Sequence, residues 1–242
     1  YIYVLIIRAR FNLMVSNHPK ALKVLFFTEM WERMSYYGMR GILVLFMTAS
    51  IQDGGLDFSN SSASAIYGIY AAAVYLATLP GGWIADNLYG QQKTVLYGGI
   101  IIMFGHLILA IPNMSLFYFG LTLVVIGTGL LKPNISALVG GLYENKIDMR
   151  ESGFTIFYMS INLGSILGFF ICGYLGENIG WHYGFGAAGI GMLFGVIQYK
   201  LNMKSLGKIG LSPSNSINLE IKNKYERIIL VISLFISLLV IS

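Results

Sequence analysis

Six long apolar segments alternate with short polar ones over most of the chain. Each segment is long enough to cross a hydrocarbon core of about 30 Å, which takes roughly 20 helical residues. The segments are apolar without a break instead of alternating residue by residue, so they predict transmembrane helices and not the strands of a β-barrel. The predicted fold class is an all-α integral membrane protein with a six-helix bundle, whose spans cover residues 21–49, 63–85, 93–112, 115–141, 153–175 and 183–201.

The pattern changes at both ends of this predicted bundle, which occupies residues 21–201. Residues 1–20 are predicted to be a cytoplasmic N-terminal segment, and residues 202–227 are polar, which is typical of a linker. Residues 228–242 are apolar again, and we interpret them as a truncated further helix. The first residue is Tyr1 and not Met, and the last apolar run stops at the end of the chain, so both ends are expected to be those of a fragment.

The composition agrees with a membrane protein. Hydrophobic residues make up 56% of the chain and charged residues 11%, whereas ordinary soluble domains carry roughly 25% charged residues. The one cysteine, Cys172, allows neither an internal disulfide nor a thiolate metal cluster, and the three histidines lie far apart in the sequence. We therefore expect no metal site and no cofactor.

The basic residues are unevenly distributed between the two sides of the predicted membrane. Of 16 Lys and Arg residues, thirteen lie on one side, and the opposite loops carry none. Positive charges stay on the cytoplasmic side, so the N-terminus and the linker are predicted to be cytoplasmic, in a multi-pass protein of the cell (inner) membrane. The net charge of +5 follows from this topology and gives no reason to expect nucleic acid as a partner.

Five charged residues lie inside the predicted spans and away from their ends, and a single charge near the bilayer centre costs about 2.5–3.5 kcal/mol. They are Glu29, Glu32, Arg33, Arg40 and Lys132. Such residues have to pair in a protein-lined or water-filled interior, and by default they mark an ion or substrate pathway. With three cations and two anions, the group has a surplus positive charge, which suits an anionic group such as a substrate carboxylate.

Most of these residues share one face of the first predicted helix. At 100° per residue, Glu29, Arg33, Tyr36 and Arg40 fall within an arc of roughly 60°, and Glu32 lies beside them. The alternative is a structural set of ion pairs that only fixes helix packing. Two charges would be enough for packing, and this helix has four.

Lys132 lies in the middle of the fourth predicted span, directly before Pro133 and Asn134. The proline removes a backbone donor, so we expect a kink in the helix at this point. A lysine beside a helix break suits a functional site. The alternative is a lysine whose side chain extends to the membrane interface.

A carboxylate whose arginine partner can also bind substrate suggests a mechanism of coupling. When a proton and a substrate compete for the same pairings, binding of one changes the affinity for the other. On this hypothesis, the Glu32→Gln substitution abolishes gradient-driven accumulation and leaves exchange partly intact.

Four motifs follow one another along the chain: EMWERMSYYGMRGILVLFM from Glu29, GGWIADNLYGQQKT from Gly81, KPNIS from Lys132 and FYMSINLGS from Phe157. The first resembles the pattern E-x-x-E-R-F followed by Y-Y-G, with Met34 in place of the Phe. Together the motifs resemble the proton-dependent oligopeptide transporters, a branch of the major facilitator superfamily, over about residues 18–200. The resemblance implies that the chain is the N-terminal bundle of a two-bundle fold, with a C-terminal bundle, the lipid bilayer and a di- or tripeptide as its partners.

The resemblance also implies roles for individual residues, with protons as the coupling ion. The proton-coupling group would be Glu29, Glu32, Arg33 and Lys132. The peptide-contacting residues would be Tyr36, Tyr37, Arg40, Tyr70, Asn134 and Asn162. A cytoplasmic gating element between the second and third spans would contain Gly82, Asp86, Gly90 and Lys93.

Several of these residues have structural alternatives. Tyr67 and Tyr75 compete with Tyr70 for the place on the second helix. The amide of Asn162 could form a hydrogen bond between helices, the glycines of the gating motif could serve helix packing, and Asp86 could cap the next helix.

The predicted function is a proton-coupled symporter that imports di- and tripeptides. An intramembrane enzyme is disfavoured, because the predicted spans contain no Ser–His pair, no metal-binding histidine set and no paired aspartates. Two alternatives remain: a transporter of the same family with another small substrate, and an inactive fragment of a split gene.

Overall fold

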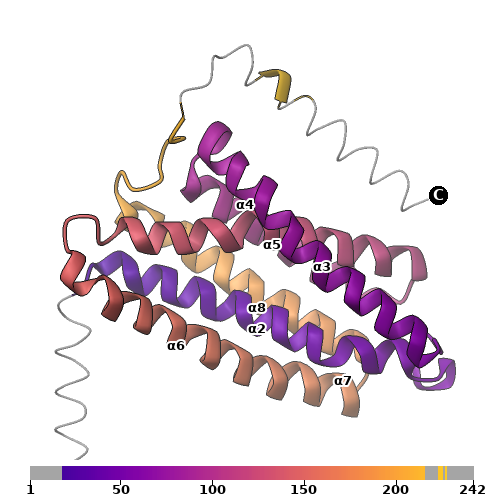
Figure 1. The fold of residues 1–242 in the computed structure, drawn as a ribbon. Coiled ribbons are helices and arrows are strands. Elements are labelled where there is room, and N and C mark those ends of the chain that lie inside the picture. The colour runs from indigo at the N-terminus through magenta and orange to yellow at the C-terminus, as the bar shows by residue number, and fades with distance from the viewer. Residues whose placement is uncertain (1–17, 216–222, 226, 228–242) are drawn as a thin grey trace, which may run out of the picture.

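The computed structural model describes residues 18–215, 223–225 and 227, and within these residues every regular element is a helix (Figure 1). The all-α prediction is therefore confirmed for this part of the chain. The long helices are α2 (Lys20–Thr48), α3 (Asn60–Ile84), α4 (Gln91–Leu109), α5 (Met114–Gly141), α6 (Arg150–Gly168) and α8 (Trp181–Asn202). A π-helical turn, Phe169–Gly173, joins α6 to the short helix α7 (Tyr174–Asn178).

The long helices begin and end within a few residues of the predicted spans, except that the π-helical turn and α7 complete the span predicted at 153–175. Among the described residues, four helical segments are long and apolar enough to cross a membrane: Asn60–Tyr89, Gln91–Leu109, Met114–Gly141 and Ile147–Asn178. α2 differs from these because it carries the predicted buried charges, and α8 differs because polar side chains lie near both of its ends. The chain is thus a helical protein with several membrane-capable helices.

α2 packs chiefly against α6 and α8, while α4 lies against α5 and α8, and α3 against α5 (Figure 1). Glycines allow the closest approaches. A side chain at Gly164 or Gly168 of α6 would overlap the backbone carbonyl oxygen of Met30 or Met34 of α2. Small residues at such crossings are the usual means of packing membrane helices.

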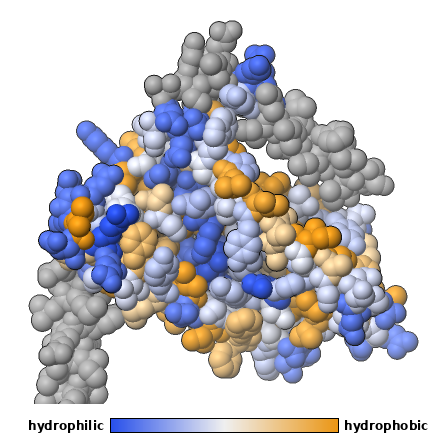
Figure 2. All heavy atoms as spheres, in the orientation of Figure 1, coloured by the Kyte–Doolittle hydropathy of each residue, from blue (hydrophilic) through white to orange (hydrophobic). Residues whose placement is uncertain are grey.

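The side of α2 that faces α3 and α5 is less closely packed than the side that faces α6 and α8. α2 has fewer contacts with these two helices than with α6 and α8. Hydrophilic residues interrupt the apolar surface in the middle of the face between α3 and α6 (Figure 2). The charged side chains predicted from the sequence lie on this side of the bundle, as described below.

The predicted loop between the second and third spans is almost entirely helical. α3 continues into a π-helical turn, Ala85–Tyr89, and Gly90 alone separates this turn from α4. Gly90 is the N-cap of α4 and has a φ of +78°, a left-handed value that glycine adopts without steric cost. The alternative that Asp86 caps the next helix is therefore wrong, because Asp86 lies inside the π-helical turn.

Local sequence explains where two of the helices begin. Ser59 and Asn113 are the N-caps of α3 and α5, and their side chains accept hydrogen bonds from the backbone N–H groups three residues later. α5 continues on both sides of Pro133, and the expected kink stays a prediction. Most of the predicted N-terminal segment 1–20 and all of the predicted truncated helix 228–242 lie outside the described residues.

Candidate functional site

Four charged side chains meet between α2 and α5. Arg33 Nη2 donates a hydrogen bond of 2.6 Å to Glu32 Oε1, and Arg33 Nε bonds to Glu32 Oε2. Arg33 Nε also lies 3.3 Å from Glu29 Oε1, one helical turn away. Lys132 Nζ donates to the same Glu29 oxygen at 2.8 Å. The structure brings together all four residues that we predicted for proton coupling, and their role stays a prediction.

Three of the four side chains in the cluster are withdrawn from solvent, and Lys132 is partly exposed. The side chains of Glu29 and Glu32 are 0% exposed, that of Arg33 is 6% exposed and that of Lys132 is 33% exposed. Buried ions lose their hydration, so they persist only beside close, hydrogen-bonded partners. Two positive and two negative groups balance here. A proton or a ligand that removes one member from its partner therefore changes the pairing of all the others.

The predicted substrate residues of α2 continue this charged column. The guanidinium carbon of Arg33 lies 4.9 Å from the ring centre of Tyr36 and 5.8 Å from that of Tyr37. The guanidinium carbon of Arg40 lies 5.1 Å from the ring centre of Tyr67, and its Nε bonds to the Tyr67 hydroxyl. These are cation–π distances, so the column alternates cations with aromatic rings.

The partner of Arg40 on α3 is thus Tyr67, which the sequence predicts only as an alternative to Tyr70. Tyr70 is 4% exposed, and its hydroxyl has no hydrogen-bond partner among the described residues. Tyrosines three residues apart share a helix face, so the spacing indicated both residues without distinguishing them. A role of Tyr70 in peptide binding stays a prediction.

The two predicted asparagine ligands lie in different surroundings. Asn134 Nδ2 donates to the carbonyl oxygen of Leu130 at 2.7 Å and to that of Gly81 on α3 at 3.1 Å. This amide therefore ties α5 to α3. Asn162 of α6 is exposed, so its side chain is open to a ligand or to another chain. The assignment of both to peptide contact stays a prediction.

In the predicted gating motif, Gly81 packs against α5. The neighbouring Gly82, which was the glycine predicted for gating, does not. A methyl group at Gly81 would overlap the carbonyl oxygen of Gly129 on α5, whereas a methyl group at Gly82 would meet no atom within 4 Å. The packing alternative therefore holds for the first glycine of the pair. The rotation of α3 about its axis decides which of two adjacent glycines faces α5, and a local motif does not specify that rotation.

The other gating residues lie at the start of α4 and in the turn before it. The backbone carbonyl of Asp86 accepts a hydrogen bond of 2.9 Å from the N–H of Asn215, a residue of the predicted linker. The carbonyl of Gly90 accepts from the hydroxyl of Thr94 at 2.8 Å. Lys93 is exposed. Gating by these residues stays a prediction.

Comparison with known proteins decides the family. The sequence model of the POT family matches residues 92–226, more than half of the chain. The chain belongs to the POT family. One relative of this POT-family chain is a peptide transporter of Yersinia enterocolitica, which is 48% identical over 76% of the chain and 37% of the relative. Another is a di-/tripeptide transporter of Lactococcus lactis, which is 43% identical over 86% of the chain and 43% of the relative.

The fold of the POT family is also found among solved structures. The crystal structure of a peptide transporter POT in complex with sulfate superposes with a TM-score of 0.85 at 44% identity, over 92% of this chain and 46% of that protein. The likeness thus extends over 76–92% of the chain but less than half of each relative. The relatives are transporters, which agrees with the prediction of a transporter and not an enzyme.

The two neighbouring glycines of this POT-family chain provide a matched test of helix packing. We expect Gly81→Ala to lower the free energy of unfolding by about 1–3 kcal/mol, because the new methyl group forces the backbones of α3 and α5 apart. Gly82→Ala adds the same methyl group where there is space and is expected to be neutral. Thermal unfolding in detergent would compare the two variants, and equal Tm values would contradict this account of the crossing.

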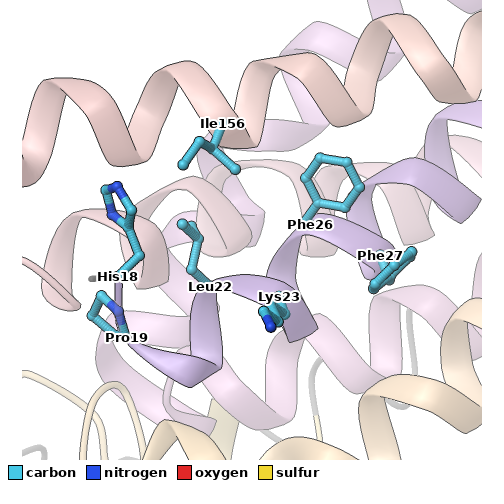
Figure 3. A pocket seen from close by; sticks show the side chains of 7 residues that line it. All are labelled: His18, Pro19, Leu22, Lys23, Phe26, Phe27 and Ile156. Carbon is cyan, nitrogen blue, oxygen red and sulfur yellow. The ribbon is translucent and has the colours of Figure 1, made fainter. Parts of the chain in front are cut away.

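An apolar cavity of about 280 Å³ lies away from the charge cluster, at the N-terminal end of α2 (Figure 3). Its lining includes Leu22, Phe26 and Ile156, with His18 at one end, and contains none of the predicted site residues. Burial, and then Lys146, lower the pKa of His18, whose Nδ1 lies 2.6 Å from the hydroxyl oxygen of Tyr143. Within the described residues, no group of three or more His, Cys, Asp and Glu side chains could hold a metal ion.

Proposed function

We propose that this chain is the N-terminal six-helix bundle of a proton-coupled symporter that imports di- and tripeptides across the cell membrane, with its N-terminus in the cytoplasm. The observation that carries the proposal is the set of two buried carboxylates, one buried guanidinium and one partly exposed ammonium between α2 and α5. Family membership and relatives described as peptide transporters support the substrate class.

The cluster supplies a chemical route to coupling. Arg33 is bonded to Glu32 through two of its nitrogen atoms, so a proton on Glu32 weakens both contacts. The guanidinium is then free to bind a substrate carboxylate, with Arg40 further along the same helix face. Proton and peptide thereby act on one set of pairings, and binding of the first raises the affinity for the second.

Import requires a second bundle, because alternating access moves one bundle against another around a central site. The membrane-capable segments that contain α3 and α6 are mostly exposed within this chain. Large apolar side chains cover them, including Leu76, Leu79, Phe170 and Tyr174. These faces suit lipid and a C-terminal bundle. A carboxylate for the amino terminus of the peptide would come from that second bundle, since this one has both of its buried carboxylates already paired.

The decisive experiment is uptake of dialanine into liposomes, driven by an acidic external pH. The protein is translated from the entire reading frame that encodes this chain, and free alanine and lactose serve as controls. We expect accumulation of dialanine alone, abolished when a protonophore collapses the gradient. Folded protein that accumulates no dialanine would refute the peptide assignment, and uptake of another small substrate would favour the alternative transporter.

A further inference from the structure

The segment that follows α8 lies across the junction between α3 and α4 (Figure 1). We call residues 203–215 the strap. It begins with a 3-10 turn, Met203–Leu206, and Leu206 is 1% exposed. Further on, the side chain of Ile209 packs so closely on Gly141 of α5 that a methyl group there would lie 2.7 Å from it. The strap is therefore packed onto the bundle.

Gln92, in the first turn of α4, is the main polar contact between the bundle and the strap. Its side-chain Nε2 donates to the carbonyl oxygens of Gly207 at 3.0 Å and Ile209 at 2.7 Å. Its backbone N–H donates to the carbonyl oxygen of Gly210 at 3.0 Å, and its own carbonyl accepts from the hydroxyl of Tyr199 on α8 at 3.1 Å. Gln92 is 2% exposed, so water cannot easily replace these bonds.

The strap also contacts the two ends of the junction. A methyl group at Gly90 would lie 2.8 Å from the carbonyl oxygens of Gly210 and Leu211, so the backbones touch where Gly90 turns the chain into α4. At the other end, Asn215 donates from its N–H to the Asp86 carbonyl at 2.9 Å and from Nδ2 to Asn87 Oδ1 at 3.1 Å. Two of the residues predicted for gating, Asp86 and Gly90, therefore lie against the strap.

We propose that Gln92 is a positioning residue for transport. Its hydrogen bonds hold the strap against the α3–α4 junction, an attachment that we call the lock, so that the junction and the strap move together. The inference rests on the proposed function. The bonds of Gln92 go to the strap and to α8, whereas Arg40, a predicted substrate residue on α2, bonds to Tyr67 on α3. Loss of the lock should therefore slow the conformational step and leave peptide affinity unchanged.

The test uses protein from the entire reading frame in liposomes. Gln92→Glu keeps the size of the side chain but removes the amide donors, and we expect it to lower the maximal rate of dialanine uptake about three- to tenfold with an unchanged KM. Gln92→Asn keeps an amide and should recover part of the rate. Lys208→Ala, an exposed position on the strap itself, is the matched control and should transport like the wild type.

Hydrogen exchange of residues 203–215 gives a readout that does not depend on transport. We expect faster exchange in Gln92→Glu than in the wild type and in Lys208→Ala.

If Gln92→Glu does not fold, Asn215→Ala at the exposed end of the strap should show both effects, the lower transport rate and the faster exchange, more weakly. An unchanged rate with unchanged exchange, or a change of KM alone, would overturn the proposal. If the wild type itself transports no peptide, the proposed function fails, while faster exchange still demonstrates the lock.

Discussion

Replacing Arg33 with leucine is expected to lower the free energy of unfolding by about 3–5 kcal/mol, the range found when one partner is removed from a buried ion pair. The substitution leaves Glu29 and Glu32, whose side chains are 0% exposed, with only one cation between them. Of these two, only Glu29 contacts Lys132, so Glu32 would be buried without a positive partner. Chemical unfolding of the purified protein in detergent would measure the loss.

A double substitution separates charge from packing in this prediction. Glu32→Gln combined with Arg33→Leu removes one charge of each sign, and we expect it to recover most of the stability lost in Arg33→Leu alone. Arg33→Lys keeps the charge but not the paired nitrogen atoms that bond to Glu32, so an intermediate loss is expected. If Arg33→Leu were as stable as the wild type, the cluster would have to be hydrated, contrary to its burial in the structure.

The charge cluster could be predicted from the sequence because two simple constraints act on it. A helix places Glu29 and Arg33, four residues apart, on one face, and a membrane interior requires that charges be paired. Their ion pair follows from these constraints. The partnership with Lys132 on another helix came instead from family resemblance, since spacing within one helix says nothing about a neighbour 103 residues away.

Features that depend on how helices face one another were predicted less well. Tyr67 and Tyr70 share one face of α3, and Gly81 and Gly82 share a motif. A small rotation of α3 about its axis decides which tyrosine contacts Arg40 and which glycine packs against α5. Gln92 was missed altogether. In the sequence it is one polar residue in a short polar stretch, and its burial arises only when a segment more than 100 residues later folds back onto it.

The membrane-capable helices could be predicted from the sequence for a related reason. Apolar length and composition identify the four most hydrophobic helical segments directly. A stricter limit on hydropathy and charge, which these four segments meet, omits α2 and α8, and in α2 the charged residues lower the hydropathy; the long apolar pattern of residues 21–49 and 183–201 nevertheless predicts both helices. α2 is recognisable as part of the bundle from its packing between α6 and α8. Charged residues inside a span therefore make that span harder to find by hydropathy alone.

Glu32→Gln is expected to abolish gradient-driven accumulation of dialanine while leaving exchange of internal for external peptide partly intact. Glutamine has nearly the size of glutamate, and its amide oxygen can still accept a hydrogen bond from Arg33 in place of Glu32 Oε1. It cannot take up a proton in the pH range of transport. Substrate can thus still bind and cross, whereas residue 32 can no longer take up the proton whose binding would be coupled to that of the substrate. Uptake and counterflow in liposomes, measured with the same protein preparation, would report the two activities separately.

The matched control for this prediction is Glu151→Gln, the same chemical change at an exposed position in the first turn of α6, which should transport like the wild type. Loss of both accumulation and exchange would indicate that Glu32 is needed for substrate binding or folding instead of coupling. Full accumulation by Glu32→Gln would refute the coupling hypothesis, because the carboxylate bonded to Arg33 would then carry no transported proton. Glu29, which contacts both Arg33 and Lys132, would be the remaining carboxylate of the cluster to test.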